Sequence, residues 1–383
     1  MLTSRWFYSG IVLCAATLAA CSGGGNANTS TADSAMPPMS DARTRANGLA
    51  AGAAASSVLS TLTAERTIGS TVIPAINQGN PYGLDVAKIS SGKILAGDLI
   101  VCNFNNSANT QGEGTSMVAL RPIIGSSPRL ITNTAALRGC NALLAAPTGP
   151  IWAADWTENI NPIFNANGGF ITGLNQEHWH HPFGEAFAPP VNQNSDPAFY
   201  VSNAGDGSLV RVYVLAGPTF KFTTIVTGFP INNGLPGGIL GPSGLNYQRA
   251  GDRLYVVDGT NNALYAIDNV SRIAAGGIVV HGTAFSGSQA GAAHLIYKGS
   301  PLNGPVSSAV LFNGNIVLGN TLDPDGKNLM VEISPSGALL HISNVDTGAA
   351  GAIFGMVATG TSASTTRLYF NDDNDNTVKV LEP

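Results

Sequence analysis

Short apolar runs separated by clusters of Gly, Asn and Asp repeat along most of the chain. Residues 244–267 show the pattern most clearly: a short run, a Gly-Asp turn, the apolar run 254–257, an Asp-Gly-Thr-Asn-Asn turn and a further run. Runs of this length between turn residues are typical of β-strands, and nothing in the segment has the period of a helix. One unit cannot bury its own apolar residues, so the pattern predicts that several units pack together.

The central apolar strand of this unit occurs six times. The copies are spaced by 51, 49, 55, 61 and 53 residues, counted through Ile100, Ile151, Tyr200, Tyr255, Ile316 and Tyr369. A Gly or another small residue opens an earlier strand before each copy, and a turn of Asn, Asp or Gly follows. The second copy is the least regular. This spacing indicates one supersecondary unit that is repeated six times.

The apolar strands have no polar face. Residues 99–102 and 254–257 are apolar at every position, whereas a sandwich strand with one exposed face would alternate apolar and polar residues. Radially stacked sheets require strands that are covered on both faces, because each sheet packs between two neighbours. The sequence therefore predicts an all-β fold over residues 65–383, namely a six-bladed β-propeller.

The two ends of the chain predict how the ring closes. The last unit contains the strand 377–381 but no fourth strand after it, and the segment T-V-I-P-A-I at residues 71–76 precedes the first unit. We expect residues 71–76 to supply the missing outer strand. The N- and C-terminal strands would then pair within one blade.

The units resemble NHL repeats, in which a Pro-x-Gly entry precedes an apolar strand ending in Asp and an Asn-rich turn. The resemblance is carried best by P-S-G at 242–244, Y-V-V-D at 255–258 and N-N at 261–262, and it covers roughly residues 79–383. It implies a propeller scaffold. NHL-type propellers include protein-binding, ligand-binding and catalytic members, so the resemblance does not select a function.

The first 20 residues have the features of a secretory signal peptide. Arg5 precedes an apolar run from Trp6 to Ala20 that is short for a membrane span. The sequence L-A-A-C at 18–21 resembles the lipobox of bacterial lipoproteins, which implies a lipid on Cys21 and, with Ser22 next, transfer to the outer membrane. Residues 21–64 have the composition of a flexible low-complexity tether. We expect a lipid-anchored protein of the bacterial cell envelope that contacts the membrane only through its anchor.

Charge excludes one class of partner. The net charge is −5, and without Arg5 of the signal the balance is 17 basic against 23 acidic residues, or −6. A nucleic-acid-binding protein would show a basic excess and clustered Lys and Arg, so we expect no nucleic-acid partner.

Two cysteines remain after Cys14 in the signal and Cys21 at the anchor are set aside. Cys102 and Cys140 fall in consecutive repeats, and an oxidising compartment permits a disulfide between them. Cys102 lies in an apolar strand, where a buried free thiol is also ordinary. Both interpretations are consistent with the sequence.

Two polar segments have the composition of metal sites. The segment N-D-D-N-D-N at 371–376 is rich in the oxygen ligands that calcium prefers, but similar turns follow the strand in other units, so the hairpin-turn interpretation is favoured. The candidate loop site comprises His178, Trp179, His180 and His181. In an extended segment His178 and His180 would share a face and could bind zinc or copper; alternatively the segment is a polar loop at the propeller mouth.

The entry strands carry the remaining candidates, which are Asp85, Asn141, Glu185 and Asn246. In a propeller the innermost strands surround the central channel, where these side chains could converge. The set is similar to the Glu, Asn and Asp ring that holds one calcium in lactonases and esterases related to gluconolactonase and paraoxonase, and this similarity implies calcium as a cofactor. Glu185 is one residue out of register with the others, so its side chain could point to the opposite face.

No catalytic motif is evident. The chain lacks G-x-S-x-G, a P-loop, a dinucleotide fingerprint and paired C-x-x-C motifs. The leading hypothesis is a non-catalytic binding or interaction module whose partner is an envelope protein, a glycan or a small ligand. The alternative is a calcium-dependent lactonase-like or esterase-like hydrolase with a metal in the central channel.

Overall fold

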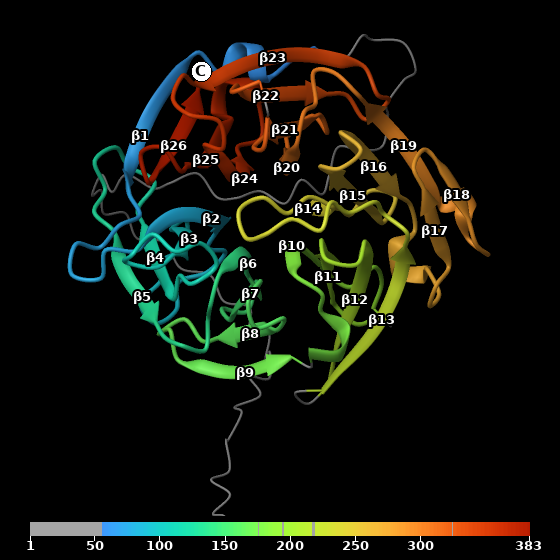
Figure 1. Ribbon diagram of the computed structural model, residues 1–383, viewed down its shortest axis with the longest axis horizontal. Coiled ribbons are helices and arrows are strands. Elements are labelled where there is room, and N and C mark those ends of the chain that lie inside the picture. Colours follow the sequence, from blue (N-terminus) through green and yellow to red (C-terminus); the bar gives the residue numbers. More distant parts are fainter. Residues whose placement is uncertain (1–55, 175, 194, 217–218, 324) are drawn as a thin grey trace, which may run out of the picture. The chain divides into compact units, whose positions relative to one another are not determined.

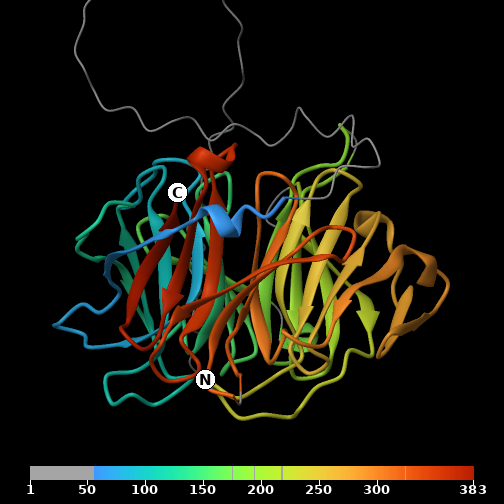
Figure 2. The same cartoon turned by 90° about the horizontal axis from the view of Figure 1, so that it is seen from above.

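A computed structural model describes residues 56–174, 176–193, 195–216, 219–323 and 325–383. Six β-sheets form a ring around a central axis (Figure 1), and the edge-on view in Figure 2 shows their strands running between the two faces of the ring. The predicted six-bladed β-propeller is confirmed. Among the described residues, no helix is both long and apolar enough to cross a membrane.

The first three blades follow one another along the chain. Blade 1 contains β2 (Gly79–Val86), β3 (Leu99–Asn105), β4 (Ser116–Leu120) and β5 (Arg129–Asn133). Blade 2 contains β6 (Cys140–Ala145), β7 (Ile151–Asp155), β8 (Asn161–Phe164) and β9 (Phe170–Leu174). Blade 3 contains β10 (Pro182–Ala188), β11 (Ala198–Asn203), β12 (Ser208–Leu215) and β13 (Thr219–Thr227).

The other three blades include an exchange of strands. Blade 4 contains β14 (Pro242–Gln248), β15 (Arg253–Asp258), β16 (Ala263–Ile267) and β19 (Ala293–Lys298). The hairpin β17 (Ile278–His281) and β18 (Ala284–Ser286) lies between β16 and β19 in sequence but extends the sheet of blade 3. Blade 5 contains β20 (Pro305–Val310), β21 (Ile316–Asn320), β22 (Asn328–Ile333) and β23 (Leu339–Asp346). Blade 6 contains β24 (Ile353–Thr359), β25 (Arg367–Asp372), β26 (Thr377–Glu382) and β1 (Ala64–Ser70).

The hydrophobic core lies between neighbouring sheets, as the two-sided apolar strands predict. Every residue of β3 is buried, and Leu254 to Asp258 of β15 are buried as well. One face of β15 packs toward blade 3 and the other toward blade 5, so Leu254 and Tyr255 belong to different core clusters. Burial on both faces fixes the strand register, since a slip of one residue would exchange the two faces.

The ring closes through the two ends of the chain, but not through the expected segment. β1 pairs with β26 from Ala64 opposite Glu382 to Ser70 opposite Thr377, and Figure 1 shows blue β1 beside red β26. The predicted terminal pairing is confirmed, whereas the assignment of residues 71–76 as the outer strand is wrong. Pro74 has no N–H for a strand ladder, and the apolar side chain that blade 6 needs comes from Ile68.

A glycine in the inner strand allows neighbouring blades to approach closely. A Cβ atom at Gly184 would overlap the carbonyl oxygen of Ser243 in the inner strand of blade 4, and one at Gly355 would overlap the carbonyl oxygen of Tyr82 in blade 1. The Pro-x-Gly entry therefore reflects backbone packing around the axis.

Candidate functional site

The inner strands bring one side chain each to an equivalent place near the axis. β2, β6, β10, β14, β20 and β24 contact one another all round the ring. Pairing with the second strands defines this inner position as Leu84, Leu143, Glu185, Leu245, Ser308 and Met356. Four of the six side chains are apolar and belong to the cores between blades. Glu185 thus places a carboxyl group where four other blades have Leu or Met.

Glu185 is buried between blades 2 and 3. Its residue is 8% exposed, and its Oε2 has no hydrogen-bond partner. In the amide orientation that satisfies both of its polar atoms, Asn161 of β8 donates to Glu185 and, at 2.6 Å, to the carbonyl oxygen of Ala153. Burial raises the pKa of Glu185 well above its usual range, and the nearby Asp85 carboxylate raises it further. Burial therefore favours the protonated form of this carboxyl group.

Asp85 and Asn246 occupy equivalent positions and tie adjacent blades together. One Asp85 carboxylate oxygen accepts the backbone N–H of Ala145 at 2.9 Å, and the other pairs with Lys88 at 2.9 Å. Asn246 donates to the carbonyl oxygen and the hydroxyl of Ser308 at 3.0 and 2.7 Å. Both side chains therefore have structural partners in the next blade, and Asn246 lies at a different blade junction from the other three candidates.

Asn141 lies three places earlier in the strand than its distance from Gly139 predicts, because Leu144 is the residue equivalent to Asp85. Cys140 lies opposite Asp155 in blade 2, just as Pro182 lies opposite Asn203 in blade 3. The residue that follows each of them occupies the same place in its inner strand, so Asn141 is equivalent to Phe183 and to Tyr82 of blade 1. Its amide nitrogen donates to the carbonyl oxygen of Pro182 at 2.9 Å. Its Oδ1 is buried and has no partner.

An aromatic cluster closes the axis where the inner strands begin; we call this end the mouth. The ring of Tyr82 is stacked between Phe104, at a centroid distance of 4.1 Å, and Phe354, at 3.6 Å. Phe183, Ala204, Ile239 and Val306 complete the cluster. A hollow beside these rings is lined by Tyr82, Asn141, Phe183, Gly237, Ile239, Val306, Leu322 and Phe354. The mouth therefore combines apolar walls with the unpartnered oxygen of Asn141.

The histidine segment does not gather its rings around one point. The ring of His178 stacks on Phe222 at 4.6 Å, whereas that of His181 stacks on Trp156 at 4.1 Å. The exposed His180 faces Asp206, with Nε2 3.6 Å from the carboxylate. Trp179 is only 1% exposed, so it is a core residue and not a contact surface. Three rings with three different partners do not form the closely spaced ligand set of a zinc or copper site.

The acidic C-terminal loop already holds a cation of its own. Carboxylates of Asp346, Asp372 and Asp375 lie close enough together to share an ion. The ammonium group of Lys379 lies 2.5 Å from Asp372 and 3.0 Å from Asp375. Asp372 also accepts the backbone N–H of Asp375 at 3.3 Å, which is the turn chemistry that the sequence favours. Lys379 supplies the positive charge that a calcium ion would otherwise bring.

A buried glutamate in blade 5 holds an N-terminal segment that the sequence assigned to the tether. Glu332 accepts the backbone N–H of Val58 at 2.9 Å and of Leu59 at 3.0 Å, and it also binds the hydroxyl of Ser57. The short helix Leu59–Thr61 follows, and Val58, Leu59 and Leu62 are buried against blades 5 and 6. We call residues 56–62 the latch. The propeller domain therefore includes these residues as well as residues 65–383.

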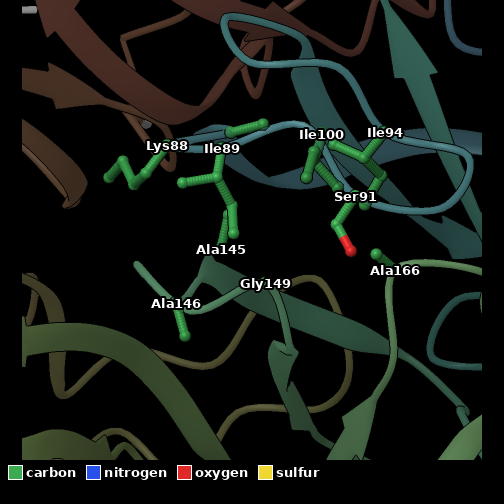
Figure 3. Close-up of a pocket in the computed structure, with 10 residues that line it drawn as sticks. Lys88, Ile89, Ser91, Ile94, Ile100, Ala145, Ala146, Gly149 and Ala166 are labelled. Carbon is green, nitrogen blue, oxygen red and sulfur yellow. The ribbon is translucent and has the colours of Figure 1, made fainter. Parts of the chain in front are cut away.

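Blades 1 and 2 share a disulfide and a second hollow. The disulfide joins Cys102 of β3 to Cys140 of β6, whose Cα atoms are 6.0 Å apart. Figure 3 shows the hollow, with Ile94 and Ile100 on its blade 1 side and Ala145 on its blade 2 side. Its charged lining residue, Lys88, is paired with Asp85. Ser91 adds a hydroxyl group to this otherwise largely apolar lining.

Comparison with known proteins supports the fold and no more. No protein-family model and no curated protein matches the sequence. The chain is similar to the calcium-binding protein regucalcin from Agrobacterium tumefaciens, with 12% identity and a TM-score of 0.51 over 82% of this chain and 95% of that one. It is also similar to a chain of the nidogen/laminin complex, with 12% identity and a TM-score of 0.51 over 74% and 86%. Virginiamycin B lyase from Staphylococcus aureus matches with 14% identity and a TM-score of 0.48 over 83% and 84%. The similarity to regucalcin and to the nidogen/laminin chain shows the propeller architecture, which does not by itself select a function.

Proposed function

We propose that this protein is a lipid-anchored propeller of the bacterial cell envelope that binds an envelope protein, a glycan or a small ligand. The proposal of a signal peptide, a lipid on Cys21 and an outer-membrane location rests on the sequence L-A-A-C and its surroundings, which lie outside the described residues. The NHL resemblance likewise remains a resemblance in sequence pattern. Two acyl chains would hold such a domain stably at a membrane.

One observation carries the choice of a binding function: most polar candidates near the axis already have structural partners. Asp85 is bound by Lys88 and the backbone of Ala145, and Asn246 is bound to Ser308. Glu185 is a buried acid with a raised pKa, and the described residues present no nucleophile beside a base there. A rigid scaffold with an apolar mouth fits recognition better than catalysis.

A metal-assisted hydrolase is the second candidate, because two of the four candidate residues in the inner strands each have a buried oxygen atom without a partner. Oε2 of Glu185 and Oδ1 of Asn141 are ligands that calcium would accept. Calcium prefers about six to eight oxygen ligands, and Asp85 and Asn246 are engaged elsewhere. The described residues therefore fit a calcium ion incompletely, although a bound calcium would polarise the carbonyl of an ester or lactone.

One set of measurements separates the two functions. The full chain is unfolded thermally with EDTA, with calcium, and with panels of peptides, glycans and small aromatic molecules, while lactone and ester turnover is followed in parallel. A ligand at 100 times its Kd stabilises the native state by about 2.7 kcal/mol. We expect stabilisation by at least one organic ligand in EDTA and no turnover. Calcium-dependent turnover that is lost in Glu185→Gln would establish the hydrolase instead.

A further inference from the structure

The two ends of the ring differ in how many apolar side chains they expose. Each inner strand begins at the mouth and ends at the opposite end, which we call the base, and the four strands of a blade alternate in direction. Among the described residues, eleven large apolar side chains are exposed. Nine of them lie in base connections or in the first two residues of outer strands, which start at the base. Ile342 lies within β23, and Leu235 alone lies at the mouth, on the connection 228–241 that Figure 1 shows reaching across the centre of the ring.

The charges of the two ends differ as well. Counted with the strand residues that border them, the connections at the mouth contain 12 acidic and 3 basic residues, whereas those at the base contain 4 acidic and 8 basic residues. Two of the four acidic residues at the base, Asp98 and Asp252, are buried. The base is therefore positively charged and the mouth negatively charged. Such a protein takes a preferred orientation at a negatively charged surface, with its base toward that surface.

Blade 1 carries a concentration of positive charge at the base. The buried carboxylate of Asp98 accepts the N–H of Leu95 at 2.7 Å and pairs with Arg121 at 3.2 Å and with Arg129, so it joins the two base connections of this blade. Arg129 also donates to the carbonyl oxygen of Lys93 at 2.8 Å. Three cations therefore share one carboxylate, and the two guanidinium groups keep about two fifths of their side-chain surface in contact with solvent, at 39% and 41%.

Exposed apolar side chains lie on the same two connections. We call the following four residues the blade 1 tip: Leu95, Ile123, Ile124 and Leu130. Ile123 and Ile124 are each 62% exposed and lie in a tight turn, which the N–H of Ser126 closes by donating to the carbonyl oxygen of Ile123 at 3.2 Å. The same N–H donates to a carbonyl oxygen of β1 at 2.7 Å. The turn is thus held by the neighbouring blade, and it presents two adjacent apolar side chains to solvent. Exposed apolar groups beside polar ones mark interaction surfaces.

The chain enters the propeller at the base. The latch is bound by Glu332, near the end of β22, and by Asn315, which precedes β21 and donates to the carbonyl oxygen of Ser56 at 3.1 Å. Both of these positions are at the base of blade 5. In Figure 2 the short helix of the latch lies in the upper half of the ring, and the yellow-green connection between β13 and β14 runs along the bottom. A lipid on Cys21 would therefore be joined to the propeller at its base.

We propose that the base of blade 1 rests on an anionic phospholipid surface, with Ile123 and Ile124 among the headgroups and with Lys93, Arg121 and Arg129 beside the lipid phosphates. The inference rests on the proposed location in the cell envelope, and it adds a direct membrane contact to the proposed lipid anchor. Lipid phosphates complement the positive charge that a single carboxylate leaves on three cations, and the interface accepts the apolar side chains. The acidic mouth then faces away from the membrane, where a binding partner can reach it.

Brominated lipids test this orientation, because bromine on the acyl chains quenches a tryptophan that enters the membrane. The full chain is bound to vesicles of phosphatidylcholine with about one third phosphatidylglycerol. The variant is Ile124→Trp, and the matched control is Leu235→Trp, at a mouth residue that is still more exposed, at 79%. After subtraction of the unmodified protein, quenching should be at least about twofold stronger at position 124 than at position 235. Equal quenching at the two positions, or none at position 124, would overturn the proposal.

Three changes to the Ile124→Trp protein test the contributions of charge and apolar surface. Lys93→Gln should lower the ratio of quenched to unquenched protein about fivefold, whereas Lys221→Gln, at an exposed lysine of blade 3, should leave it unchanged. Ile123→Asp should abolish the quenching, and its Tm establishes that the exposed turn is still folded. About 0.5 M salt should weaken the quenching. Equal quenching on vesicles of phosphatidylcholine alone would overturn the role of the three cations.

The results also separate this inference from the proposed binding function. Absent quenching at position 124, together with stabilisation by a peptide or glycan in the unfolding experiment, would overturn the membrane contact and support the binding function. Strong quenching at position 124 with no stabilising ligand would support the membrane contact and count against the binding function.

Discussion

Two buried glutamates on opposite sides of the ring have very different surroundings. Glu332 is 0% exposed, and its carboxylate accepts hydrogen bonds from Ser57, Val58, Leu59 and Asn315, the last at 2.7 Å. Glu185 is 8% exposed, has one carboxylate oxygen without a partner, and lies near the carboxylate of Asp85. Both side chains are removed from water, but both carboxylate oxygens of Glu332 accept protein hydrogen bonds, whereas Oε2 of Glu185 has none.

The difference separates a structural acid from a candidate functional one. A buried carboxylate with several donors stabilises the segment that supplies them, whereas a buried carboxyl group without them reduces stability. Perturbed acids of the second kind concentrate at binding and catalytic sites. If this comparison is correct, removing Glu332 must weaken the fold and removing Glu185 must not.

The largest effect is expected at Glu332. Glu332→Leu should lower the free energy of unfolding by about 3 kcal/mol, because the latch loses its acceptor and Val58, Leu59 and Leu62 become exposed. Urea titration of the full chain measures the loss. Ser57→Ala removes a single hydrogen bond to the same carboxylate and should cost about 1 kcal/mol or less.

A double-mutant cycle sharpens this prediction. A chain that begins at Glu65 lacks the latch and should lose about as much stability as Glu332→Leu. In that shortened chain Glu332→Leu should cost much less, because the partners of the carboxylate are already gone. Additive losses would contradict the assignment of Glu332 to the latch.

A third buried acid, Asp372, is paired with Lys379. Removing this lysine should lower the free energy of unfolding by an amount between those expected at Glu332 and Glu185. Burial raises the pKa of Asp372 to about 6, and Lys379 opposes this rise. Lys379→Met should therefore cost about 2 kcal/mol at pH 7. Since the native state takes up a proton on Asp372 near pH 6 and the unfolded state does so only near pH 4, the cost should shrink as the pH falls below 6. Thermal unfolding from pH 5 to 8 measures it, with the exposed Lys221→Met as control.

The Lys379→Met variant also tests whether the ammonium group of Lys379 takes the place of a metal ion in this acidic loop. Without the ammonium group, Asp346, Asp372 and Asp375 would form an open set of oxygen ligands. Millimolar calcium should then raise the Tm of Lys379→Met and leave that of the unmodified protein unchanged. A calcium-dependent rise in both proteins would show that Lys379 does not fill the site.

Much of the fold could be predicted from local pattern. The runs 99–102 and 254–257 are apolar on both faces, and that property alone requires stacked sheets. The closing strand was misplaced, because residues 71–76 are more apolar than β1 and the sequence does not show which segment can pair with β26. The latch was missed because its acceptor, Glu332, lies more than 270 residues away. The V-L-x-x-L spacing at 58–62 is the one local signal that it buries a face.

The candidate site was predicted less completely, because its geometry depends on register. Asp85 and Glu185 were identified as polar residues in entry strands, but only the pairing with β3 and β11 shows that Glu185 replaces a Leu or Met. Asn141 was identified for the channel and instead lines the mouth. The sequence predicts either a ligand-binding loop or a polar loop with a packed aromatic side chain at residues 178–181, and Trp179 lies in this loop with its side chain buried in the core. No sequence pattern predicts that residues 228–241 cross the mouth.

The smallest and most informative effect is expected at Glu185. Glu185→Leu introduces the residue that blades 1, 2 and 4 have at this position, and it should raise the free energy of unfolding by about 1 kcal/mol at pH 7. The pKa of Glu185 is raised in the native state, so the unmodified protein loses stability as the pH rises from the unfolded-state value of about 4.3 toward the native one. The leucine variant lacks this loss, so its advantage should increase with pH. Thermal and urea unfolding at several pH values measure the difference.

Glu185→Gln separates the charge of this group from its shape. The amide cannot ionise, so the variant should show the same weakened pH dependence as Glu185→Leu while retaining the contact with Asn161. Leu245→Ala, at the equivalent position in blade 4, should instead cost about 2–5 kcal/mol, as expected for an ordinary core residue. If Glu185→Leu destabilised the protein as Leu245→Ala does, Glu185 would be a structural acid like Glu332. A gain in stability would mean that this chain keeps a carboxyl group at a cost to its fold, which is the property expected of a residue retained for binding.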